Sequence, residues 1–115
     1  MVVSLKEMVS DQIDKCRQAL SEGRFLLFES RVLALNSLLD SYAKSSVDDE
    51  EGRKLFEEYQ EVVREIDNLS KLNTKASKVM LIKKYNRLFK ILIRIAYKNE
   101  LLIIDPQRDL LKKFA

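Results

Sequence analysis

Five basic side chains that share one side of a predicted helix, between Thr74 and Asn99, are the strongest candidates for a binding site. At 100° per residue one narrow row holds Lys83, Arg87, Lys90, Arg94 and Lys98, with Tyr97 at its edge. The opposite arc is apolar and comprises Leu81, Ile82, Tyr85, Leu88, Phe89, Leu92, Ile95 and Ala96. Ammonium and guanidinium groups bind phosphates and carboxylates. The six residues of the row and its edge therefore form the candidate site.

Opposite charges are concentrated in two consecutive stretches of the chain. Residues 48–67 hold nine acidic and three basic side chains, whereas residues 68–99 hold nine basic and none that is acidic. An antiparallel pair of helices could bring the two charges together across its seam. However, both charged rows lie opposite apolar rows, so we expect only flanking residues such as Glu51, Glu58 and Lys84 to meet. This predicts that the five cations stay unpaired within the monomer.

Two kinds of partner fit such a row of cations. The row is about 22 Å long and could follow the phosphate backbone of DNA or RNA, in a salt-sensitive manner without sequence preference. It could instead dock on an acidic protein surface, including the row from Glu50 to Glu65 of a second copy of the chain. We predict a protein-interaction or assembly module, for which self-association of this kind is one form, with nucleic-acid binding as the alternative.

Catalytic chemistry has few candidate residues in this sequence. The chain has no histidine, and its only cysteine, Cys16, falls on the apolar face of a predicted helix. Glu58, Glu61 and Glu65 share one helix side, where a solvated acidic face is the favoured interpretation over a cation site. We therefore predict no enzyme activity, no catalytic residue, no cofactor or metal, and no small-molecule substrate.

Composition predicts a single all-α domain over residues 1–115. Only two glycines and one proline are present, which is too few for the repeated turns of a β-sandwich or barrel. A single cysteine favours a reducing compartment. No apolar stretch has the length of a signal peptide or of a membrane span, so we expect a cytoplasmic protein without a membrane partner.

Apolar periodicity predicts an antiparallel four-helix bundle. The first helix covers about 5–21, begins with a capping box from Ser4 to Glu7, and ends at Gly23. The others cover about 24–44, from 48 to about 69, and 74–99, and the second and fourth are central. The second helix has a heptad seam of Phe25, Phe28, Val32, Leu35, Leu39 and Tyr42, widened by Leu26, Leu27, Leu33 and Leu38.

Two features of the C-terminal part complete the prediction. Residues 100–104 either extend the fourth helix or form a buried connection. Asp105 followed by Pro106 is a favourable N-cap and first-turn pair, which predicts a short fifth helix from Pro106 to about Phe114.

Overall fold

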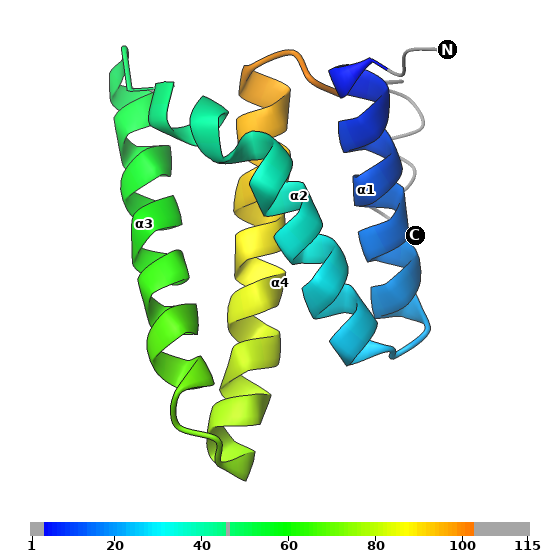
Figure 1. The fold of residues 1–115 in the computed structure, drawn as a ribbon. Helices are drawn as coiled ribbons and strands as arrows, with labels where there is room; N and C mark the ends of the chain where they lie inside the picture. The colour runs from blue at the N-terminus through cyan, green and yellow to red at the C-terminus, as the bar shows by residue number, and fades with distance from the viewer. Residues whose placement is uncertain (1–3, 46, 103–115) are drawn as a thin grey trace.

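Four α-helices make up the fold. The structure is a computed structural model that describes residues 4–45 and 47–102, and 85% of these are helical, without any strand. The helices are α1 (Leu5–Ser21), α2 (Phe25–Ser45), α3 (Glu50–Ser70) and α4 (Lys75–Lys98), as Figure 1 shows. The all-α prediction is confirmed, and the four predicted ranges agree with these helices to within about two residues. The predicted fifth helix lies outside the described residues.

Side-chain caps explain where three of the helices begin. The Ser4 hydroxyl accepts a hydrogen bond from the Glu7 amide at 3.1 Å, and the Asp49 carboxylate accepts one from the Gly52 amide at 2.6 Å. A complete capping box occurs at α4. There the Ser77 amide donates to the Thr74 hydroxyl at 3.0 Å, and the Thr74 amide donates to the Ser77 hydroxyl at 2.9 Å.

Left-handed residues end α1 and α4. Gly23, with φ of +69°, follows α1, as predicted. Glu100, with φ of +57°, does the same after α4, and the Leu101 amide donates to the Ala96 carbonyl at 2.8 Å. The chain therefore turns away after Lys98 instead of extending the helix. Of the two alternatives for residues 100–104, the described part supports the connection, because Leu101 and Leu102 are half-buried against the core.

The helices pack as two consecutive pairs joined by α2. α1 lies along α2, α3 lies along α4, and α2 crosses α4 and also contacts α3 (Figure 1). Phe28 of α2 meets Phe89 of α4 edge to face, with ring centroids 5.7 Å apart. The largest fully buried side chains are Phe28, Leu35, Leu39, Leu88, Leu92 and Ile95, all from these two helices. The prediction that α2 and α4 are central agrees with this core.

The buried face of α2 is narrower than the sequence predicts. Phe28, Val32, Leu35 and Leu39 are fully buried, but Leu26 and Leu33 were wrongly assigned to the packed face and are 83% and 47% exposed. The buried residues of α2 lie on one side of the helix, which faces its neighbours α1, α3 and α4. Leu26 and Leu33 lie about 120–140° around the helix from the centre of that buried side. Phe25, at the first residue of the helix, is also 42% exposed.

Candidate interaction surface

Three ion pairs join α3 to α4 along one seam. Asp49 pairs with Lys98 at 2.7 Å, Glu58 with Arg94 at 3.2 Å, and Glu65 with Lys84. The acidic partner moves forward along α3 as the basic partner moves back along α4, so the two helices are antiparallel. Of the three flanking residues predicted to meet the opposite helix, Glu58 and Lys84 do, whereas Glu51 makes no ion pair with a described residue and only helps raise the pKa of Lys98.

The seam corrects part of the predicted site. Arg94 and Lys98 were expected to stay unpaired in the monomer, and this is wrong, because both form ion pairs with α3. Their long side chains reach around the helix toward the seam, which their position opposite the apolar arc does not reveal. Lys98 lies at the C-terminal end of α4, where the antiparallel arrangement places it beside Asp49, the N-cap residue of α3.

Local charges shift the pKa values of the seam residues. The Lys98 ammonium group, followed by the Gly52 amide, holds the pKa of Asp49 below its usual value, and Asp49 in turn raises the pKa of Lys98. The hydrogen bond from Lys84 lowers the pKa of Glu65. The Glu58–Arg94 pair is exposed and adds little to stability, whereas Lys84 and Glu65 are only 23% and 28% exposed and are less screened by solvent. Together the three pairs fix the register of α3 against α4.

Three of the five predicted cations remain available to a partner. Lys83, Arg87 and Lys90 are exposed, and they make no ion pair with any residue that the structure describes. We call these three residues the cationic strip. Its first and last members are seven residues apart, which is about 10 Å along the helix. Tyr97, the sixth predicted site residue, lies one to two turns further on and is 65% exposed.

A row of carboxylates on α3 lies on the other side of the same seam. Glu50, Glu57 and Glu61, which we call the acidic strip, are all exposed. Glu50 pairs with Lys54 at 3.7 Å, whereas Glu57 and Glu61 have no ion pair within the described ranges. Both strips lie just beyond the exposed seam pairs, on the side of their helix opposite the buried residues. The α3–α4 hairpin thus presents two parallel strips of opposite charge.

A buried tyrosine fixes α3 against α2 and so holds this face in place. The Tyr59 hydroxyl lies 2.6 Å from Asn36 Oδ1 and 2.9 Å from Asp40 Oδ1. Its single proton is shared between these two acceptors in a bifurcated hydrogen bond. Burial is the main cause that raises the pKa of Tyr59, and the hydrogen bond from Tyr59 is the main cause that lowers the pKa of Asp40. The apolar periodicity of residues 48–69 places Tyr59 in the core row of α3, but it does not reveal the two polar partners on α2.

The residues considered for catalysis are either buried in the core or paired with cations of α4. Cys16 is fully buried, and burial raises the pKa of its thiol to about 11. Glu58 and Glu65 are held by α4 cations. Within residues 4–45 and 47–102 there is no group of three or more potential metal ligands.

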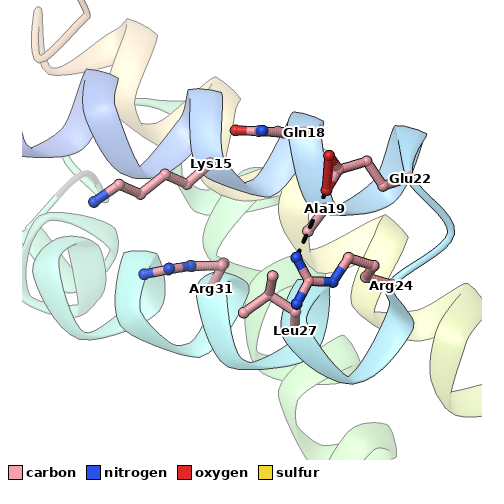
Figure 2. A pocket seen from close by; sticks show the side chains of 7 residues that line it. All are labelled: Lys15, Gln18, Ala19, Glu22, Arg24, Leu27 and Arg31. Atoms are coloured by element: carbon pink, nitrogen blue, oxygen red, sulfur yellow. Dashed lines mark ion pairs between the residues drawn. The ribbon is translucent and has the colours of Figure 1, made fainter.

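A shallow pocket between α1 and α2 is a weaker candidate (Figure 2). It is lined by Lys15, Gln18, Ala19, Glu22, Arg24, Leu27 and Arg31. Two of its three cations are already close to carboxylates, since Lys15 lies 2.9 Å from Asp11 and Arg24 lies 3.9 Å from Glu22. Figure 2 shows Arg31 extending in the same direction as Lys15, away from Glu22. The pocket therefore offers an anion little beyond one arginine.

Comparison of the chain with protein-family models, with curated proteins and with solved structures finds no match. None of the described helices is both long enough and apolar enough to cross a bilayer. Any functional inference for this chain must therefore come from its own surface.

Proposed function

We propose that this chain is a non-enzymatic assembly module that self-associates through the outer face of its α3–α4 hairpin. The observation that supports this is that the cationic strip and the acidic strip lie side by side on that face. Lys83, Arg87 and Lys90 make no ion pair with any described residue, although Arg87 lies near enough to Glu65 to help lower its pKa, and an acidic strip of the same orientation lies beside them. A second copy offers the complementary charge to both strips at once.

Charge selects one symmetry for such a dimer. A two-fold axis parallel to the hairpin places α4 of each copy over α3 of the other at the same height. Arg87 and Lys90 of one copy then face Glu57 and Glu61 of the other, whereas Glu50 lies near the level of Lys98. A two-fold axis across the hairpin would instead stack α3 on α3 and α4 on α4, which brings like charges together. The proposed dimer therefore has its axis parallel to the two helices, with two equivalent contacts.

The contact is expected to be weak and sensitive to salt. Exposed ion pairs contribute only about 0–1 kcal/mol each, and the strips contain few apolar atoms. Even if all six cations of the dimer were paired, these contacts would supply at most about 6 kcal/mol before the cost of association, so we expect a dissociation constant no tighter than about 100 μM at low salt. Assembly at higher local concentration would then be reversible.

Charge reversal tests this proposal by sedimentation velocity at low salt. The α4-reversed variant (Lys83→Glu, Arg87→Glu, Lys90→Glu) and the α3-reversed variant (Glu57→Lys, Glu61→Lys) should each be monomeric. Mixed together, they should form a heterodimer, because one copy then carries two acidic strips and the other carries two basic strips.

A matched control and circular dichroism complete the test. The control variant Lys6→Glu, Lys15→Glu, Arg17→Glu has the same change of net charge as the α4-reversed variant, but on α1, and should dimerise like the native chain. A native chain that stays monomeric at millimolar concentration would refute the proposal. Failure of two folded reversed variants to associate with each other would refute the proposed pairing.

Nucleic-acid binding through the cationic strip is the second candidate function. The three exposed cations of α4 support it, since they could contact successive phosphates. Two observations make it the weaker candidate. Arg94 and Lys98 are already paired with carboxylates. In addition, the acidic strip beside the cations would repel a phosphate backbone.

We also propose a cytoplasmic location. The support is the single thiol, Cys16, which is buried and is the only cysteine in the sequence.

A further inference from the structure

The turn between α3 and α4, together with the first two turns of α4, is both apolar and basic. We call this region the hairpin tip and define it by its exposed apolar residues Leu72, Val79 and Met80 and its exposed lysines Lys71, Lys75 and Lys78. The apolar side chains are 61%, 56% and 47% exposed, respectively. Figure 1 shows the tip at the lower end of the molecule, beyond the turn that joins α1 to α2.

Two of the three lysines of the tip, Lys75 and Lys78, do not stabilise the helix that carries them. Lys75 and Lys78 lie in the first turn of α4, at the positive end of the helix dipole, where cations are unfavourable. Neither makes an ion pair with any described residue, and only Lys71 has one, with Asp67 at 3.2 Å. The capping box of Thr74 and Ser77 orders this end of the helix without them. The positive charge is therefore available for an external anionic surface.

The exposed apolar residues indicate what kind of surface this is. A phosphate backbone would leave Leu72, Val79 and Met80 in water, so nucleic acid does not account for them. Protein interfaces favour arginine and aromatic residues and are depleted in lysine, whereas the cations of the tip are all lysines and its apolar groups are all aliphatic. Aliphatic groups surrounded by lysines suit a bilayer surface. There the aliphatic side chains enter the boundary of the acyl region, and the lysine ammonium groups reach the lipid phosphates.

We infer that the hairpin tip docks onto the surface of a bilayer that contains anionic lipids. The helices rest on the bilayer and do not cross it, in keeping with the absence of any spanning helix in the described part of the chain. The sequence predicts no membrane partner because no apolar stretch is long enough to span a bilayer, and that criterion does not detect a surface that only rests on one. Val79 and Met80 lie outside the apolar arc of α4, among the cations.

Vesicle flotation tests the inference on the full chain, with phosphatidylcholine vesicles that either contain or lack phosphatidylserine. Native protein should float only with the anionic vesicles, and salt should release it. Each lysine near an anionic surface strengthens binding about five-fold, so Lys75→Gln, Lys78→Gln should weaken binding about 25-fold. Val79→Asn, Met80→Gln should also weaken it, because the apolar contact is lost.

Matched variants separate the tip from general charge and apolar exposure. Lys6→Gln, Lys15→Gln on α1 removes the same charge, and Leu26→Asn, Leu33→Gln on α2 removes comparable exposed apolar surface, and both should float like the native chain. A Lys75→Gln, Lys78→Gln variant that loses flotation but still dimerises like the native chain in sedimentation velocity distinguishes this inference from the proposed dimer.

Three results would overturn the inference. The first is no flotation of the native chain with anionic vesicles. The second is equal binding to neutral and anionic vesicles. The third is a tip variant that floats like its matched control. If such a variant loses binding to a DNA duplex or to a polyglutamate peptide while its flotation is unchanged, the inference is overturned in the same way.

Discussion

Replacement of Tyr59 by phenylalanine is expected to weaken the attachment of α3 to α2 without disturbing the core. The ring is 95% buried and stacks near Phe56, with centroids 6.3 Å apart, and phenylalanine keeps these contacts. What is lost is the hydroxyl that hydrogen-bonds Asn36 and Asp40. A hydrogen bond to a charged group is worth about 1.5–3 kcal/mol, but the Asp40 side chain is 46% exposed and can be rehydrated. We therefore expect a loss of about 1–2 kcal/mol in the free energy of unfolding.

Urea unfolding of the native chain and of Tyr59→Phe at two pH values measures this loss. The hydrogen bond from Tyr59 lowers the pKa of Asp40 in the folded state, so the bond stabilises above the unfolded pKa of about 3.9. That stability disappears as the pH falls through the lowered pKa. The difference between the two chains should therefore be largest near pH 7 and shrink below about pH 4. A difference that is absent at pH 7, or that is unchanged at low pH, would refute the role assigned to the bond with Asp40.

Three further predictions address the core, the thiol and the cationic strip. Phe28→Ala should lower the free energy of unfolding by about 3–5 kcal/mol in urea titrations, because the ring is fully buried against α4, and a smaller effect than Phe28→Leu would contradict that packing. Cys16 should react slowly with a disulfide reagent at pH 8 until urea is added, since a pKa near 11 leaves about 100-fold less thiolate than in the unfolded chain. If duplex DNA binds through the five predicted cations, replacing all five by glutamine should reduce the logarithmic salt slope by about 2.7 and not by about 4.5, because of these five only Lys83, Arg87 and Lys90 make no ion pair with a described residue.

Helix positions were predictable from the sequence because the signals that set them are local. The cap at Ser4 and the left-handed Gly23 act within a few residues, and the structure has both where the sequence predicts them. The reciprocal capping box was misplaced. It was expected from Ser4 to Glu7, but of its two bonds the structure shows only the one to the Ser4 hydroxyl, while the complete box is formed by Thr74 and Ser77.

The candidate site was only partly predictable, because it depends on how α3 and α4 are aligned. Sequence periodicity assigns a residue to one side of its own helix but does not give the reach of a long side chain toward a neighbour. Arg94 and Lys98 were therefore expected to be unpaired and are not. The exposed positions of Val79 and Met80 could have been found from the same helical wheel, on which they flank Lys83.

The two proposals about the α3–α4 hairpin constrain each other through symmetry. A two-fold axis parallel to α3 and α4 keeps the direction of each helix, so both hairpin tips of the proposed dimer would lie at the same end. An axis across the hairpin would place the tips at opposite ends, where only one could touch a flat surface. The symmetry that brings opposite charges together is thus also the one that lets two tips engage one bilayer.

Two weak attachments held in one assembly bind more tightly than either alone. Weak self-association and weak surface binding would then strengthen each other, since molecules gathered on a bilayer reach the local concentration that the dimer requires.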